Sequence, residues 1–138
     1  FPQLAGRPLG GRGVVWFQGW NDMYDEDARA QYEDNLVHLI GDVRAEYNTP
    51  RLPVIIGELG NGGPEASDKM LAIRAAQQAA ATRSELQGNV KFISTTAFAR
   101  PKDESPNVGH GHHWFGNAES YFLIGDALGQ GMLDLLQP

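Results

Sequence analysis

The sequence predicts an α/β fold in which a parallel β-sheet is covered by helices on both faces, with about three strands and three helices in this chain. Three short runs of apolar, β-prone residues each precede a segment whose apolar residues recur at steps of three and four. Strands that alternate with helices in this way pair in parallel through right-handed crossovers. The 138 residues fit one domain with one core, because domains most often have about 100–150 residues.

The first strand is predicted near residues 14–18, where the apolar run Val14-Val-Trp-Phe17 ends at Gln18 and reads as a buried strand. A helix is predicted over 27–47, because the apolar residues there fall on one helical face. These residues are Tyr32, Leu36, Leu39, Ile40, Val43 and Tyr47.

The second strand is predicted near residues 53–57, where an apolar run is closed by a glycine, and a Gly/Pro-rich loop follows it. The next helix is predicted over 67–86, with Ser67 or Asp68 as its N-terminal cap. Its inner face is expected to carry Met70, Ile73, Ala76, Gln77 and Ala80.

The third strand is predicted near residues 90–95, and a long loop follows over about 97–115. A last helix is predicted over 117–135, because Asn117 is a favourable N-cap before another apolar face. That face consists of Tyr121, Ile124, Leu128, Met132 and Leu135.

Charge and composition narrow the classes of partner. Eleven Lys and Arg against seventeen Asp and Glu give a net charge of −6, and no basic cluster offsets it. Nucleic acid and anionic membrane surfaces are therefore poor candidate partners. No apolar run approaches the roughly 18 residues of a membrane span. The sequence has no cysteine, so disulfides and thiolate chemistry are both excluded.

The start of the chain suggests a larger protein. The first residue is Phe1, and the earliest methionine is Met23, inside a predicted functional loop. Three strands also make a small sheet for a doubly wound domain. We therefore expect residues 1–138 to be the C-terminal portion of one domain, and the missing N-terminal half of the same fold is a candidate partner.

Three segments are expected to meet at the carboxyl ends of the strands, where parallel sheets bind ligands: Gln18–Asp22, Glu58–Gly63 and the loop over 97–115. The first of them carries two side-chain amides, Gln18 and Asn21, whose N–H groups can donate to a developing oxyanion. The alternative is an ordinary strand-to-loop turn, in which Gly, Asn and Asp supply tight backbone geometry.

The loop over 97–115 holds three of the four histidines, at His110, His112 and His113. A histidine on such a loop can act as general base to a serine hydroxyl, with a carboxylate orienting the imidazole. The three can instead bind zinc, although their spacing does not match the usual ligand patterns, or form a polar surface loop. The fourth, His38, is expected on a helix face.

Two motifs carry a family resemblance. Trp16-Phe-Gln-Gly-Trp-Asn-Asp22 resembles a motif of the sialate O-acetylesterase-like enzymes, the carbohydrate esterase family 6 branch of the SGNH hydrolases, and His113-Trp-Phe-Gly-Asn-Ala-Glu-Ser-Tyr121 is similar to that family's closing block. Weaker blocks match in order between them: Leu39-Ile-Gly-Asp-Val-Arg44, Leu52-Pro-Val-Ile-Ile-Gly57 and Ile73-Arg-Ala-Ala-Gln77. The resemblance runs from about residue 13 to residue 132.

The resemblance implies a flavodoxin-like three-layer α/β/α fold and the hydrolysis of acetyl esters on carbohydrates by a Ser-His-acid mechanism. It implies no cofactor and no metal, and it favours a periplasmic or secreted bacterial enzyme. Gln18 matches the amide donor of the oxyanion hole, with Gly19 beside it and Asn21 as a second donor. His113 matches the catalytic base.

The chain departs from the family pattern in two places. Nothing in it matches the family's Gly-Gln-Ser-Asn-like nucleophile block, so the serine is expected from a missing segment, and this chain alone is expected to be inactive. The family's acid often lies three residues before the histidine, where this chain has His110. Asp103 or Glu104 is the nearest substitute.

A second hypothesis is a non-catalytic carbohydrate-binding or interaction module. Trp16, Trp20 and Trp114 lie near predicted strand ends, where aromatic faces can stack on sugar rings. A third is association with a separate chain along an unpaired edge of the sheet.

Overall fold

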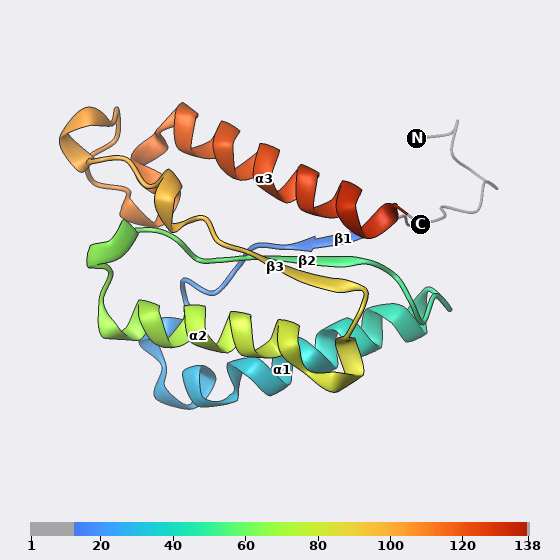
Figure 1. Ribbon diagram of the computed structural model, residues 1–138. Coiled ribbons are helices and arrows are strands. Elements are labelled where there is room, and N and C mark those ends of the chain that lie inside the picture. The colour runs from blue at the N-terminus through green and yellow to red at the C-terminus, as the bar shows by residue number, and fades with distance from the viewer. Residues whose placement is uncertain (1–12, 138) are drawn as a thin grey trace, which may run out of the picture.

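The structure, a computed structural model, describes residues 13–137 and contains a three-stranded sheet in the order β1-β2-β3. The strands are β1 (Val14–Trp16), β2 (Val54–Gly57) and β3 (Val90–Ile93), and both neighbouring pairs are parallel. The helices are α1 (Glu26–Glu46), α2 (Asp68–Thr82) and α3 (Ala118–Leu136). Helices α1 and α2 cover one face of the sheet and α3 covers the other, as Figure 1 shows. The predicted three-layer α/β fold is therefore confirmed in this partial form.

All three helices begin at a side-chain cap, and the sequence predicted the caps of α2 and α3. The Asp25 carboxylate accepts a hydrogen bond from the Ala28 amide at 2.9 Å. Ser67 caps α2 by accepting from the Met70 amide, and Asn117 caps α3 by accepting from the Ser120 amide. These bonds satisfy amide groups that have no partner within the first turn of a helix.

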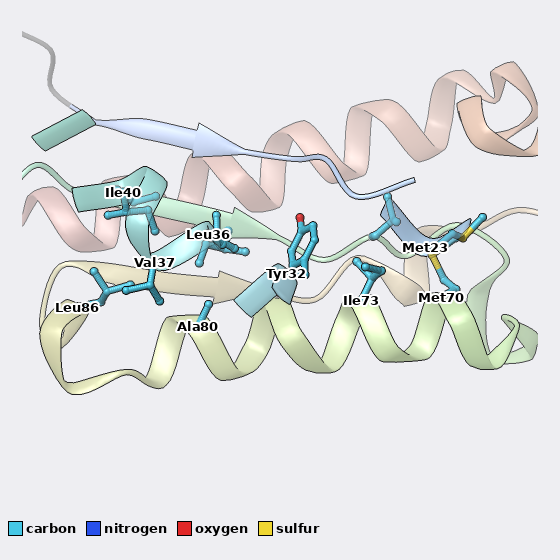
Figure 2. Packing of buried hydrophobic residues seen from close by; sticks show 12 residues of the cluster. Met23, Tyr32, Leu36, Val37, Ile40, Met70, Ile73, Ala80 and Leu86 are labelled. Carbon is cyan, nitrogen blue, oxygen red and sulfur yellow. The ribbon is translucent and has the colours of Figure 1, made fainter. Parts of the chain in front are cut away.

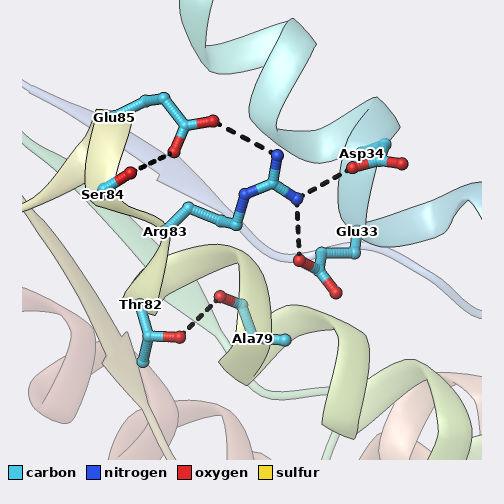
Figure 3. Close-up of polar contacts among 7 residues, drawn as sticks. All are labelled: Glu33, Asp34, Ala79, Thr82, Arg83, Ser84 and Glu85. Atoms are coloured by element: carbon cyan, nitrogen blue, oxygen red, sulfur yellow. Dashed lines mark hydrogen bonds and ion pairs between the residues drawn. The ribbon is translucent and has the colours of Figure 1, made fainter.

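The second helix ends earlier than the predicted range of 67–86. Arg83 is in an extended conformation, with ψ at 138°, and Ser84–Leu86 forms a separate 3-10 turn. The guanidinium of Arg83 pairs with Glu33 at 3.0 Å and with Asp34 at 2.9 Å, both on α1 (Figure 3). This link between the two helices holds the chain where it leaves α2.

The sheet separates two apolar clusters. Side chains of α1 and α2, including Leu36 and Ile73, pack together on one face (Figure 2). The completely buried Ile56 of β2 belongs to the same cluster. On the other face, Ile55 packs with Trp114 and with the inner side of α3. Successive residues of β2 therefore point to opposite layers, as the pleat of a strand requires.

The first strand is less buried than its apolar run predicts. Val14 and Trp16 pack against the α1–α2 cluster, but Val15 on the opposite face is 49% exposed. β1 is hydrogen-bonded to β2 alone within the described residues, and it ends the sheet on that side. No helix within residues 13–137 is long and apolar enough to cross a membrane.

A buried carboxylate joins the ends of the two neighbouring strands β2 and β3. Glu58 accepts hydrogen bonds from the Ser94 hydroxyl at 2.6 Å and from the amides of Thr95 and Thr96 at 2.8 and 2.9 Å. Burial raises the pKa of the Glu58 carboxyl, but these hydrogen bonds outweigh burial and hold the pKa below its usual value. Glu58 is therefore ionised at neutral pH and fixes the loop that follows β2.

Replacing Gly60 with alanine is expected to destabilise the protein by about 2–3 kcal/mol, because the loop after β2 has no room for a methyl group. A Cβ at Gly60 would lie 2.6 Å from the carbonyl carbon of Thr95 and 2.7 Å from the amide nitrogen of Thr96. These are backbone atoms, so no side-chain rotation can relieve the clash. Urea denaturation of the two proteins measures the difference.

Gly109 provides the matched control, because a Cβ there meets no atom within 4 Å. Gly109→Ala is expected to change the free energy of unfolding by less than about 0.5 kcal/mol. Equal stabilities for the Gly60 and Gly109 variants would contradict the close packing of Gly60 on Thr95.

Candidate active site

A cavity of about 400 Å³ opens at the carboxyl ends of the strands. Its walls come from four parts of the chain: residues 17–21 after β1, Leu59 and Asn61 after β2, the loop over 112–114, and Tyr121 on α3. The predicted residues Gln18, Gly19, Asn21 and His113 all line this cavity. Asp103 does not line it.

The Gln18 segment is held by its backbone, which leaves its amide side chain at the cavity. The Gln18 carbonyl accepts hydrogen bonds from the Tyr32 hydroxyl at 2.6 Å and from the Gln77 amide at 3.0 Å. The Gln18 Nε2 donates to the Asp22 carboxylate at 2.6 Å. Because an amide nitrogen carries two N–H groups, this bond leaves one N–H for a ligand.

Close packing also fixes Gly19. Its φ of +149° belongs to the region that side-chain-bearing residues rarely adopt. A Cβ there would meet Ile73 at 2.8 Å and the Tyr32 hydroxyl at 3.2 Å. A glycine at this position lets the backbone lie against the core while its neighbours face the cavity.

Gln77 on α2 joins two walls of the cavity and was not recognised as functional from the sequence. Its side chain is completely buried. The Oε1 atom accepts from the Leu59 amide at 2.8 Å, and the Nε2 atom donates to the carbonyls of Gln18 and Gly57 at 3.0 and 3.3 Å. One amide therefore holds the ends of β1 and β2 in register.

Arg74, one helical turn before Gln77, holds the next part of the same loop. Its guanidinium donates to the carbonyls of Leu59, Asn61 and Gly63, each at 2.9 Å. Burial lowers the pKa of Arg74, and the nearby Glu58 carboxylate partly counteracts this effect. A signal was present in the sequence for Gln77, which falls on the predicted inner face of this helix, where a polar side chain requires a buried partner. Arg74 was not placed on that face, but the structure buries it beside Gln77.

The loop that carries the histidines is bent by two consecutive aromatic residues in left-handed conformations, Trp114 with φ at 51° and Phe115 with φ at 53°. Bulky residues are rarely found there, and each costs about 1–3 kcal/mol. Trp114 is buried and stacks on Phe17 with 6.3 Å between the ring centroids. The Tyr121 hydroxyl donates to the His113 carbonyl at 3.0 Å. These contacts hold the base candidate at the cavity.

The three imidazoles lie together, and His112 is in the middle. Its ring centroid is 4.3 Å from that of His113 and 5.3 Å from that of His110. Desolvation, with smaller contributions from the charges of His113 and His110, lowers the pKa of His112. Within residues 13–137, no group of three His, Cys, Asp or Glu side chains is arranged to hold a metal ion, so the zinc alternative has no ligand set there.

Two predicted residues lie away from the cavity. Asp103 lies in an exposed 3-10 turn, Lys102–Glu104, and its carboxylate has no hydrogen bond to an imidazole among the described residues. Its role as the acid partner of His113 stays a prediction. His38 lies on α1, within the predicted helix, and its side chain is exposed.

None of the chain's five serines lines the cavity. Ser105 is buried, donates to the Pro101 carbonyl and accepts from the Asn117 amide. Ser120 is completely buried and donates to the Phe98 carbonyl. Ser67, Ser84 and Ser94 bond to the Met70 amide, the Glu85 carboxylate and the Glu58 carboxylate. Each serine therefore has a hydrogen-bond partner other than His113.

Comparison with known proteins gave two matches. A family model described as "Carbohydrate esterase, sialic acid-specific acetylesterase" matches residues 5–133. A protein of Arabidopsis thaliana described as a "Probable carbohydrate esterase" is 36% identical over 59 residues. That alignment covers 41% of this chain and 23% of the plant protein, so the match spans less than a quarter of that relative's length. No solved structure matches the chain.

Proposed function

Because the chain belongs to the carbohydrate esterase family of sialic acid-specific acetylesterases, we propose that it supplies the base and the oxyanion donors of a serine-type acetylesterase. The substrate is an acetylated carbohydrate, and the products are acetate and the free sugar hydroxyl. The observation that carries the proposal is the cavity shared by Gln18, Gly19, Asn21 and His113. It combines an imidazole with amide groups, which are the two functions that acyl transfer needs besides a nucleophile.

In the proposed mechanism, the His113 imidazole takes the proton of a serine hydroxyl as the serine oxygen attacks the acetyl carbonyl. The resulting oxyanion accepts hydrogen bonds from the Gln18 side chain and from Asn21 or the backbone at Gly19. Protonated His113 then gives its proton to the sugar oxygen as the ester bond breaks. Water, deprotonated by His113, attacks the acetyl-serine, releases acetate and restores the serine.

The serine of this mechanism comes from outside the 138 residues. The support is the free edge of β1, which is paired on its β2 side alone in the described part of the chain. A strand added in parallel at this edge would end beside Gln18, because the carboxyl ends of parallel strands share one side of a sheet. Phe122 and Leu133 on α3 are 74% and 54% exposed, so apolar surface remains for a helix that follows such a strand.

The acid that orients His113 is proposed on sequence grounds to be Asp103. Its turn follows β3 in the same long loop as His113, ten positions before that residue in the chain. An exposed turn can shift when a further segment completes the site, and the carboxylate has to reach an imidazole nitrogen at about 2.6–3.2 Å to act.

Carbohydrate binding without catalysis is the second candidate function, and one aromatic residue favours it. Trp20 lines the cavity, with its ring 6.2 Å from Tyr24 and 5.7 Å from His112 between centroids. The other two tryptophans considered for stacking serve the fold: Trp114 is buried, and the Trp16 indole donates to the Tyr32 hydroxyl. Trp20 is therefore the residue on which a sugar ring is expected to stack.

Alone, this 138-residue chain is expected to hydrolyse p-nitrophenyl acetate and acetylated sialic acid at a rate near the uncatalysed background. A base and an oxyanion hole without a nucleophile retain little of a triad's activity. A longer protein, in which a strand ending in a Gly-x-Ser block precedes this sequence, is expected to restore turnover. Its Ser→Ala variant is the control, and it is expected to return to background.

Rapid turnover by the 138-residue chain itself would overturn the proposal that the serine comes from outside. Ser105→Ala then identifies whether the loop serine is the nucleophile, because Ser105 lies in the same long loop as Asp103 and His113.

A further inference from the structure

One buried polar atom at the cavity has no partner. Asn61 is 3% exposed and lies in the loop after β2. Its Oδ1 is the one buried side-chain oxygen or nitrogen within residues 13–137 that makes no hydrogen bond. A buried acceptor left unpaired costs about 1–3 kcal/mol, so folded proteins usually satisfy such atoms with a ligand or an ordered water.

The orientation of the Asn61 amide is fixed by its neighbours. The Nδ2 atom donates to the carbonyls of Gly111 and His112 at 3.1 and 3.3 Å. A rotation that exchanges Oδ1 and Nδ2 would set the oxygen against two carbonyl oxygens. The unpaired atom is therefore an acceptor, and it can be satisfied only by a group that donates a hydrogen bond.

Asn61 is also held rigidly, so its acceptor cannot turn towards water at the surface. The Arg74 guanidinium donates to the Asn61 carbonyl at 2.9 Å, and the amide bonds tie the side chain to the histidine loop. The residue lines the 400 Å³ cavity and also a neighbouring cavity of about 280 Å³. Trp20 lines the same two cavities, so its side chain and Asn61 border one space.

We propose that Asn61 Oδ1 is a recognition site for one hydroxyl group of the sugar, which donates to it while the ring stacks on Trp20. This inference rests on the proposed function, because it takes the ligand to be a carbohydrate. It assigns Asn61 to substrate recognition and not to the reacting atoms. An acceptor with no other partner discriminates strongly against an analogue that lacks the donor, since that analogue leaves the atom unpaired.

The test compares sugars that differ by one hydroxyl. The folded 138-residue chain is titrated with N-acetylneuraminic acid and with its monodeoxy analogues, and dissociation constants are measured by NMR. One analogue is expected to bind about 3- to 10-fold more weakly than the parent sugar, the size expected for one hydrogen bond. In Asn61→Ala that difference is expected to vanish, and parent and analogue bind equally.

This comparison separates recognition from a structural role. If Asn61 only holds the loop, Asn61→Ala weakens all the sugars by the same factor and the preference for the hydroxyl persists. If Asn61→Ala does not fold, the Asn61 Nδ2 resonances of the wild-type chain provide the second readout. They are expected to shift with the parent sugar and not with the one discriminating analogue.

Three results would overturn the inference. Equal binding of the parent and every deoxy analogue to the wild-type chain would mean that Oδ1 accepts from water and not from the sugar. A preference that survives in Asn61→Ala would assign the hydroxyl to another residue. Both results leave the esterase proposal standing, whereas no binding of any sugar by the folded chain would overturn the carbohydrate site and this inference together.

Discussion

Replacing His113 with alanine is expected to lower kcat by at least about 10⁴-fold in the enzyme that contains both this chain and the serine-bearing segment. The imidazole is the base for both halves of the proposed reaction, and its neighbours cannot substitute at the same position because Tyr121 and the bent backbone hold His113 itself at the cavity. The measurement is kcat at saturating acetylated substrate, with folding checked by circular dichroism.

His110→Ala is the matched control. It removes an exposed imidazole from the same loop, and His110 does not line the 400 Å³ cavity. Its kcat is expected to stay within a few-fold of the wild-type value. A loss in His110→Ala as large as that in His113→Ala, or a His113→Ala enzyme within tenfold of the wild type, would contradict the assignment of the base.

Replacing Gln77 with leucine is expected to lower the free energy of unfolding by about 3–5 kcal/mol, which is among the largest effects of a single substitution in a protein of this size. Leucine has a similar volume but cannot hydrogen-bond. The Leu59 amide and the carbonyls of Gln18 and Gly57 each lose their hydrogen bond to the Gln77 side chain. Urea denaturation followed by tryptophan fluorescence measures the change.

The neighbouring residue provides the control on the same helix. Gln78 is exposed, so Gln78→Leu makes the same chemical change without removing a buried bond, and it is expected to change stability by less than about 0.5 kcal/mol. If the two variants unfold at the same urea concentration, the hydrogen bonds of Gln77 do not hold the cavity walls together.

The parts of the fold that could be predicted depend on neighbouring residues in the sequence. The caps at Ser67 and Asn117 bond to amides three residues further along the chain. The apolar run of β2 is visible in the sequence itself. The end of α2 was predicted four residues too late, and Arg83, which follows it, pairs with residues 50 and 49 positions earlier in the sequence. Contacts between residues so far apart in the sequence leave no pattern among neighbouring residues.

The same distinction applies to the site. Gln18 and His113 could be recognised because each lies in a motif. Gln77 and Asn61 could not, because their roles depend on partners 59 and 50 residues away. Gln77 did leave a weak signal, since it is a polar residue on the predicted apolar face of its helix.

The bent loop at Trp114 and Phe115 has a consequence for how the protein responds to selection. Two aromatic residues in left-handed conformations hold free energy that glycine would release, although Trp114 regains part of it by packing beneath α3. Sequences selected for thermostability alone are therefore expected to replace Phe115 first, and to lose activity as they gain stability. We therefore expect a trade-off between stability and activity at Phe115, two residues after the proposed base.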